Sequence, residues 1–177
     1  MNASQVLDEL DRWHDLIRVD SSDAAVVDRY KGFIAEEVLE SLEAKSLGNL
    51  VKELCDILVV TRPVELLGSG YASKVARHQS HAARALLHEL DVYCWWPALH
   101  IVNQSNFSKF ILESELKEAY EHFKQLGIEV CINPIAQDYF GAYSSKDQTV
   151  NGKEYAGGKL LKGPKYQEID ESTEWWK

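Results

Sequence analysis

The most informative stretch of the sequence is residues 33–61, which read FIAEEVLESLEAKSLGNLVKELCDILVVT. Apolar residues recur at helical spacing in its first part and predict a helix over residues 24–45. A short break at residues 46–49 precedes a second predicted helix that runs to Thr61, where Pro63 ends or kinks it. Because the connection is short, we expect the two helices to be antiparallel neighbours.

The first of these helices carries three acidic residues on one side. At about 100° per residue, Glu36, Glu37 and Glu40 project into a single sector of the helix. No Lys or Arg lies between Glu36 and Glu43 to balance them, although like charges one turn apart repel. A Glu-rich helix can also be an ordinary solvated surface, and that alternative stays open for these three residues taken alone.

The second helix carries Glu53 and Asp56 among apolar residues on nearly every side. A helix of this kind is normally buried, so we expect both carboxylates to lie inside the fold. We expect no Lys or Arg of the same helix to reach that face. An unpaired buried carboxylate takes up a proton or binds a cation. Carboxylate oxygens without His or Cys favour Mg²⁺ or Mn²⁺ over zinc, and no His follows a Glu by three, as di-iron bundles require.

The composition limits the classes of partner. The chain of 177 residues has 28 acidic and 19 basic residues and a formal net charge of −9. This charge argues against nucleic acid or an anionic membrane as a partner, and an anionic ligand would need metal cations at its site. The three cysteines are widely spaced, and no apolar run is long enough to span a bilayer. The opening residues are acidic and show no secretory signal, so we expect a cytoplasmic protein.

The remaining chain predicts a mainly α protein with a small C-terminal α+β appendage. Ser4 is the expected cap of the first helix, and Pro97 is expected to kink or restart the helix predicted over residues 91–102. Residues 1–110 are expected to form a helical catalytic bundle, and residues 111–177 the appendage with a tail. The other expected elements are helices over residues 5–18, 72–89 and 113–126, a strand over 128–132 that pairs with 139–143, and a turn at 151–152.

The carboxylate pattern resembles the EExxE and ExxD signature of the all-α nucleoside triphosphate pyrophosphohydrolases, which include MazG, the phosphoribosyl-ATP enzyme HisE and the dimeric dUTPases. Here it consists of Glu36-Glu37-Val38-Leu39-Glu40, twelve intervening residues, and Glu53-Leu54-Cys55-Asp56. Two later segments resemble the SNxSK and GKxxK elements of HisE-like and phage-encoded MazG-like members. They are Ser105-Asn106-Phe107-Ser108-Lys109 and Gly158-Lys159-Leu160-Leu161-Lys162-Gly163.

The resemblance implies a helical bundle that uses Mg²⁺ or Mn²⁺, with two or more ions, to hydrolyse a nucleotide. The implied substrate is a (deoxy)nucleoside triphosphate such as dGTP or GTP, and the implied products are the monophosphate and pyrophosphate. By the same resemblance, Glu36 is a water-orienting base or outer ligand, and Glu37 shares catalysis with metal binding. The implied metal ligands are Glu37, Glu40, Glu53 and Asp56, and the implied substrate contacts are Asn106, Lys109, Lys159 and Lys162.

Two other functions stay open: phosphoribosyl-ATP hydrolysis, and a helical module that senses nucleotides without hydrolysing them. The helices and aromatic residues of one copy also favour a homodimer or homotetramer. Trp175-Trp176 is expected to be either an anchor for another subunit or disordered.

For several further residues the sequence allows both an ordinary structural role and a functional role. The histidines of residues 78–88 are expected to be ordinary surface or half-buried groups rather than ligands, and His14 is either a pocket residue or a core residue. Aromatic residues near Pro97 could stack on a base, although core packing is favoured for two of the three. The aromatic residues are Tyr93, Trp95 and Trp96, and the histidines are His78, His81 and His88. Four basic residues are expected to be solvated charges: Lys45, Lys52, Lys74 and Arg77.

Overall fold

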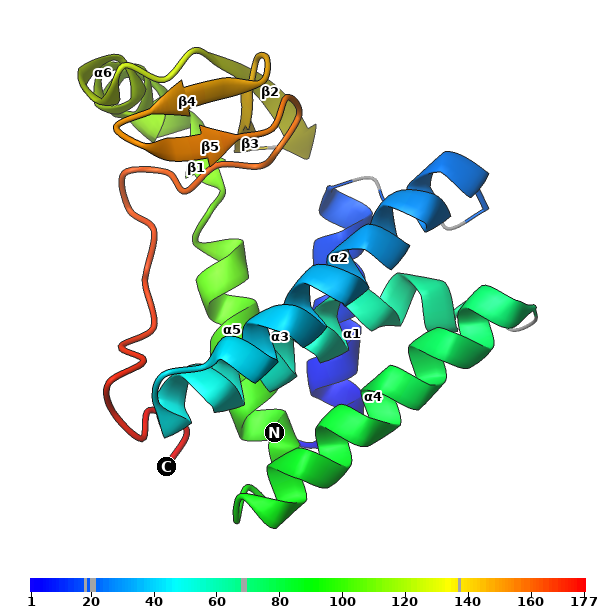
Figure 1. Ribbon diagram of the computed structural model, residues 1–177. Coiled ribbons are helices and arrows are strands. Elements are labelled where there is room, and N and C mark those ends of the chain that lie inside the picture. Colours follow the sequence, from blue (N-terminus) through cyan, green and yellow to red (C-terminus); the bar gives the residue numbers. More distant parts are fainter. Residues whose placement is uncertain (18, 20–21, 68–69, 137) are drawn as a thin grey trace. The chain divides into compact units, whose positions relative to one another are not determined.

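The computed structural model describes residues 1–17, 19, 22–67, 70–136 and 138–177. Within these ranges the protein is mainly helical, with short strands confined to its C-terminal part, as predicted (Figure 1). The expected helix end at Arg18, part of the turn before Asp23, and the loop at Gly68 and Ser69 lie outside the described residues.

The chain forms two compact units. The first contains residues 1–103 together with the tail, residues 169–177, and the second contains residues 104–168. This division differs from the expected boundary at residue 110, which assigned the tail to the appendage. The tail belongs with the helices because it hydrogen-bonds to the start of the third helix.

The first unit contains the helices that carry the acidic residues. Each of the first three begins at a capping side chain, which satisfies backbone N–H groups that have no partner within the helix. The helices are α1 (Ala3–Leu16), α2 (Ala24–Glu43), α3 (Leu47–Glu65), α4 (Tyr71–Glu89) and α5 (Trp95–Phe107), the last of which ends in the second unit.

Helix α3 lies at the centre of the first unit and packs against α1, α2 and α4. Leu54, Cys55 and Val51 are almost completely buried, which confirms that this helix is covered on nearly all sides. On one side, Val60 and Val64 pack with Tyr30 and other buried residues of α2 and α4. Helices α2 and α3 run antiparallel, as predicted from their short connection (Figure 1).

Three helix limits differ from the sequence predictions. Asn2, rather than Ser4, caps α1 and forms a reciprocal capping box with Gln5. Helix α3 continues through Pro63 to Glu65, so Pro63 does not end it. Helix α5 begins at Trp95 and places Pro97 in its first turn, where the missing N–H costs no helical hydrogen bond.

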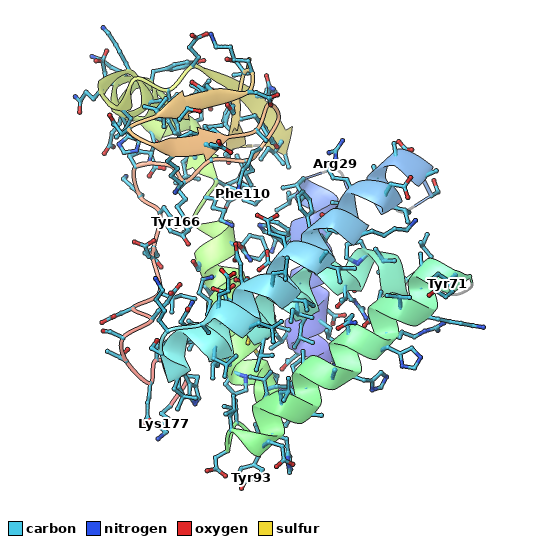
Figure 2. All side chains as sticks on the ribbon, viewed as in Figure 1. Arg29, Tyr71, Tyr93, Phe110, Tyr166 and Lys177 are labelled. Atoms are coloured by element: carbon cyan, nitrogen blue, oxygen red, sulfur yellow. The ribbon has the colours of Figure 1, made fainter. Side chains whose placement is uncertain are left out.

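The aromatic residues at the two ends of α4 are exposed to solvent. Tyr71 begins the helix and Tyr93 follows its end, as the side-chain view shows (Figure 2). The Tyr93 hydroxyl donates to Asp91 Oδ1 at 2.6 Å. None of the helices in the described part of the chain combines the length and hydropathy needed to cross a membrane.

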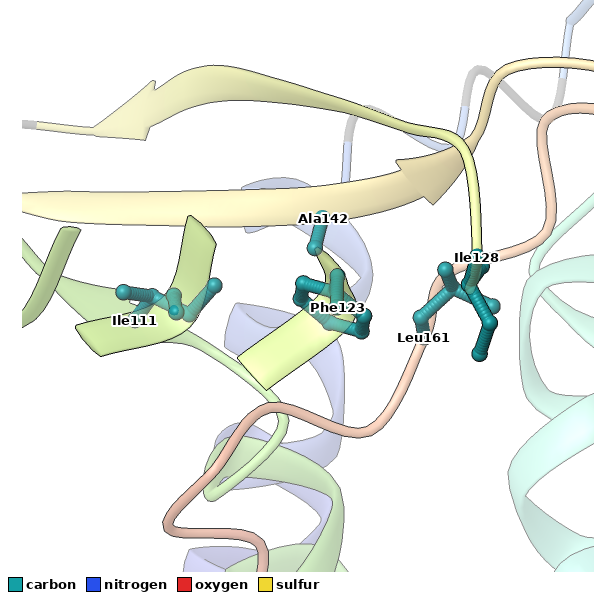
Figure 3. Packing of buried hydrophobic residues seen from close by; sticks show 6 residues of the cluster. Ile111, Phe123, Ile128, Ala142 and Leu161 are labelled. Carbon is teal, nitrogen blue, oxygen red and sulfur yellow. The ribbon is translucent and has the colours of Figure 1, made fainter. Parts of the chain in front are cut away.

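The second unit places one helix against a small antiparallel sheet. Phe123 is buried with Ile111, Ala142 and Leu161 in its core (Figure 3). The strands have the order β1-β3-β2, and a separate two-stranded sheet pairs β4 with β5. The elements are β1 (Ile111–Leu112), a 3₁₀ turn (Glu113–Glu115), α6 (Leu116–Leu126), β2 (Val130–Ala136), β3 (Tyr139–Ser144), β4 (Gln148–Val150) and β5 (Lys153–Tyr155).

The pairing predicted between the strands at residues 128–132 and 139–143 is confirmed, although β2 begins two residues later, at Val130. The predicted turn is also confirmed. Asn151 and Gly152 connect β4 to β5 with φ angles of 53° and 78°, which is typical of a tight hairpin.

Candidate metal centre

Acidic side chains of α2 and α3 meet where these helices pack. One carboxylate oxygen each of Glu37, Glu40 and Glu53 lies within 4.8 Å of the other two. Glu53 is 4% exposed, Glu37 is half-buried and Glu40 is exposed. The cluster therefore reaches from a buried carboxylate on α3 to a solvent-accessible one on α2.

Asp56 extends the negative charge of this cluster by one helical turn along α3. Its charge is among the causes that raise the pKa values of Glu37 and Glu53. Glu36 lies on α2 beside Glu37 but is exposed and is not a member of the group of three. The structure therefore places four carboxylates close enough for electrostatic interaction, those of Glu37, Glu40, Glu53 and Asp56.

Burial and mutual repulsion disfavour charge on Glu37. Desolvation, followed by the charges of Asp56, Glu40 and Glu53, raises its pKa to about 9. Desolvation also raises the pKa of Glu53, although Lys52 opposes that shift. Burial and the neighbouring carboxylates therefore favour the protonated form of Glu37.

Lys52 supplies an internal positive charge, contrary to the expectation that no basic residue of the helix reaches this face. Its Nζ donates to Glu53 Oε1 at 3.0 Å and to Asp56 Oδ2 at 2.9 Å. Burial alone would lower the pKa of Lys52, but Asp56 and Glu53 raise it by charge and by hydrogen bonding. The expectation that Lys52 is a solvated charge is wrong because its long side chain reaches the carboxylates one and four residues ahead.

The two carboxylate oxygens of Glu53 differ in their hydrogen bonds. Its Oε1 accepts from Asn49 Nδ2 at 2.9 Å as well as from Lys52. Its Oε2 is buried and has no hydrogen-bond partner among the described residues. A buried carboxylate oxygen without a partner is costly, and a cation would satisfy it. The donor set consists only of carboxylates, which fits Mg²⁺ or Mn²⁺.

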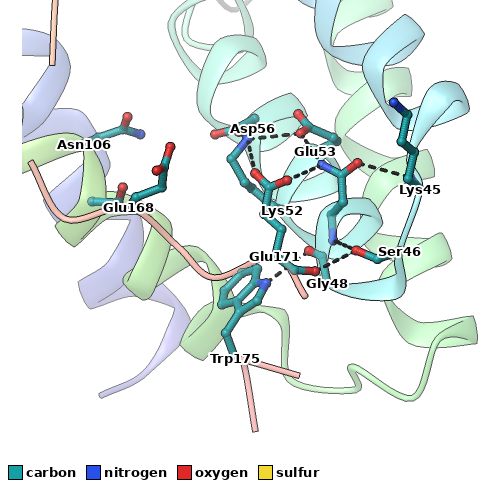
Figure 4. A network of polar contacts seen from close by, with 12 residues as sticks. Lys45, Ser46, Gly48, Lys52, Glu53, Asp56, Asn106, Glu168, Glu171 and Trp175 are labelled. Carbon is teal, nitrogen blue, oxygen red and sulfur yellow. Dashed lines mark hydrogen bonds and ion pairs between the residues drawn. The ribbon is translucent and has the colours of Figure 1, made fainter. Parts of the chain in front are cut away.

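The C-terminal tail also lies against this site, a contact that no pattern in the sequence indicates (Figure 4). The carboxylate of Glu171 accepts from Asn49 Nδ2 at 2.9 Å and lies 3.6 Å from Lys52 Nζ. Trp175 Nε1 donates to the backbone oxygen of Gly48 at 3.0 Å. The expectation of a disordered end is therefore wrong for Trp175, which contacts α3 of the same chain, whereas a contact with another subunit stays a prediction.

The four implied substrate contacts lie in the second unit. Lys109 Nζ donates to Asn106 Oδ1 at 2.6 Å, and Lys159 is exposed. Lys162 pairs with Glu168 at 2.9 Å, and its Nζ lies 4.4 Å from the centre of the Tyr166 ring. The approach of these residues to the carboxylates stays a prediction.

The remaining candidates do not form a second metal group within the described ranges. The three histidines of α4, His78, His81 and His88, are exposed. His14 is buried in the core, with its ring centre 5.1 Å from that of Trp13 and 6.0 Å from that of Tyr30.

No family model, no curated protein and no solved structure matches the chain. The candidate site is therefore assigned from the chemistry of its own residues.

Proposed function

We propose that this protein is a Mg²⁺- or Mn²⁺-dependent nucleoside triphosphate diphosphohydrolase, similar to the MazG-like members of the all-α nucleoside triphosphate pyrophosphohydrolases. The observation that carries the proposal is the cluster of carboxylate oxygens of Glu37, Glu40 and Glu53 within 4.8 Å of one another. Within this cluster, Oε2 of Glu53 is buried and has no hydrogen-bond partner among the described residues. Such a cluster on two antiparallel helices fits the EExxE and ExxD pattern of the sequence.

The charge of the substrate explains why an acidic site would bind it. A nucleoside triphosphate carries several negative charges, and a cluster of carboxylates repels it unless cations intervene. Glu37, Glu40, Glu53 and Asp56 would hold Mg²⁺ or Mn²⁺, which when bound supplies a Lewis acid that neutralises phosphate oxygens and acidifies water.

The reaction is hydrolysis between the α- and β-phosphates. The oxygen of a water molecule forms a bond to the α-phosphorus. The bond from the α-phosphorus to the oxygen that bridges it to the β-phosphorus breaks, and pyrophosphate leaves. Glu36, exposed beside the cluster, would accept the proton of the water or bind as an outer ligand. Asn106, Lys109, Lys159 and Lys162 would contact the sugar and the phosphate oxygens.

The substrate class and assembly are part of the same proposal. Among nucleotides, dGTP and GTP are the proposed substrates. A homodimer or homotetramer is proposed because α2 exposes apolar side chains beside the cluster, with Leu39 60% and Leu42 78% exposed.

The test is an assay of the purified chain with each common NTP and dNTP in Mg²⁺ or Mn²⁺. Monophosphate, pyrophosphate and orthophosphate are measured separately. We expect monophosphate and pyrophosphate in equal amounts, and no turnover in chelator. Release of orthophosphate, or no turnover with either metal, would contradict the proposal. Stabilisation by nucleotide without turnover would instead support a nucleotide sensor.

Variants connect this activity to the site. Glu37→Gln and Asp56→Asn should abolish turnover while the protein stays folded, because each removes a ligand charge. Glu37→Gln also removes some repulsion, and in Asp56→Asn the ammonium of Lys52 keeps Glu53 as a partner. Glu43→Gln is the matched control, since Glu43 is exposed at the end of α2 and outside the cluster. Full activity in either site variant would disprove the ligand assignment.

A further inference from the structure

Lys52 occupies a position where it must compete with a bound cation. Its ammonium lies 3.0 Å from Glu53 Oε1 and 2.9 Å from Asp56 Oδ2. Both carboxylates are proposed metal ligands, and the side chain of Lys52 is only 22% exposed, so its charge is not fully screened by water. A divalent cation bound to these oxygens would repel the ammonium and take its partners.

Glu171 offers the displaced ammonium another partner. In the described part of the chain it is the third carboxylate paired with Lys52, and the separation of 3.6 Å is longer than a direct hydrogen bond. Oε2 of Glu171 is held by Asn49, while Oε1 is the oxygen nearest Lys52. A small movement of the flexible lysine side chain would therefore exchange Asp56 for Glu171.

The tail holds Glu171 in this place by contacts with the start of α3. Ser46 Oγ donates to the backbone oxygen of Glu171 at 2.6 Å, and Trp175 Nε1 donates to the backbone oxygen of Gly48 at 3.0 Å (Figure 4). Gly48 permits this approach because a Cβ there would lie 2.3 Å from the Glu171 oxygen. These contacts fix Glu171 relative to the helix that bears Glu53 and Asp56.

We propose that Lys52 is an internal counter-cation of the metal-free site and that Glu171, on the C-terminal tail, accepts its ammonium when a divalent cation binds. This inference rests on the proposed function. Glu171 is a positioning residue that acts through Lys52 and binds no metal itself. The tail thereby sets the affinity of the site for metal.

The test measures Mn²⁺ affinity of the full chain by isothermal titration calorimetry, without nucleotide, at fixed pH and ionic strength. Lys52→Gln and Lys52→Met should each bind Mn²⁺ roughly tenfold more tightly, because the competing charge is gone. Glu171→Gln should bind roughly tenfold more weakly. Glu174→Gln, on the same tail but paired with Lys177, is the matched control and should bind as the wild type does.

The double variant tests whether Glu171 acts through Lys52. In Lys52→Gln, adding Glu171→Gln should change Mn²⁺ affinity much less than it does in the wild type. Equal effects in both backgrounds would overturn the inference.

The sign of the Lys52 effect separates this inference from a structural role. If Lys52 only holds Glu53 and Asp56 in place, both Lys52 variants should bind Mn²⁺ more weakly, which would overturn the inference but leave the proposed function standing. An absence of Mn²⁺ binding in the wild type and in every variant would overturn both. Circular dichroism of each variant verifies that it is folded.

Discussion

The ammonium of Lys52 lies 2.9 Å from the carboxylate of Asp56, one turn further along α3. This ion pair places the one basic side chain of residues 46–61 inside an otherwise acidic cluster. The cluster also raises the pKa of Glu37 to about 9, first through burial and then through Asp56 and its neighbours. Lys52, by its charge, and Glu37, by its raised pKa, thus both reduce the negative charge of the cluster.

Glu37 should make the metal-free protein less stable as pH rises. Its pKa of about 9 in the folded state exceeds the ordinary value of 4.5, so its contribution to stability is complete below pH 4.5 and is lost as pH rises through 9. In chelator at pH 8, Glu37→Gln should melt about 2–4 °C higher than the wild type, which corresponds to roughly 1 kcal/mol. Thermal scans from pH 5 to 9 measure this difference, and Glu43→Gln should keep the wild-type slope. A difference that does not grow with pH would contradict the prediction.

Mn²⁺ should be most stabilising at high pH. Metal binding requires charged carboxylates, so the proton on Glu37 must leave when the ion binds. At an ion concentration of about 100 times the Kd at pH 8, the stabilisation is about 2.7 kcal/mol. At the same ion concentration the stabilisation should shrink as pH falls from 8 to 5, because Kd rises. Calorimetry at pH 7 in two buffers with different ionisation enthalpies should count about one proton released. Equal heats in both buffers would show that no proton leaves.

Gly48→Ala should displace the tail. A Cβ at this position would lie 2.3 Å from the backbone oxygen of Glu171 and 2.5 Å from that of Thr173. We expect a loss of about 1–3 kcal/mol in the free energy of unfolding and faster proteolysis of the tail. Gly32→Ala is the matched control, since a Cβ on α2 meets nothing within 4 Å and should stabilise the helix by up to about 1 kcal/mol. The assignment of the tail contact fails if both variants behave alike in denaturant titrations.

His14 should make the protein sensitive to acid. Burial lowers its pKa from 6.5 to about 4, so its stabilising contribution is complete above pH 6.5 and is lost as pH falls through 4. In His14→Phe, which keeps an aromatic ring between Trp13 and Tyr30, the melting temperature should fall less between pH 7 and 4. The comparison uses thermal scans of both proteins in chelator. Identical acid sensitivity would assign the effect to other groups.

The sequence predicts the acidic helices well because the relevant pattern is local. Helical spacing determines which side chains share a face of one helix, and the short connection makes α2 and α3 neighbours. The sequence alone therefore places Glu37 and Glu40 of α2 near Glu53 of α3. The burial of α3 follows from apolar residues on all its sides. Helix ends are less certain because neighbouring residues have similar capping chemistry, as Asn2 and Ser4 show.

The tail contacts could not be predicted in the same way. Glu171 and Asn49 are 122 positions apart, and neither has a sequence pattern that links it to the other. The role of Lys52 is hard to predict for a different reason. Helical phase places the Cβ atom, but the long side chain of a lysine lets its ammonium reach carboxylates of a neighbouring sector.

The most direct measurement of the central claim is the anomalous scattering of Mn²⁺ in a crystal of the protein. We predict a peak about 2.0–2.3 Å from carboxylate oxygens of Glu37, Glu40 and Glu53, with the ammonium of Lys52 moved away from Asp56. A crystal that contains Mn²⁺ elsewhere, with Lys52 still bound to Glu53 and Asp56, would contradict the account.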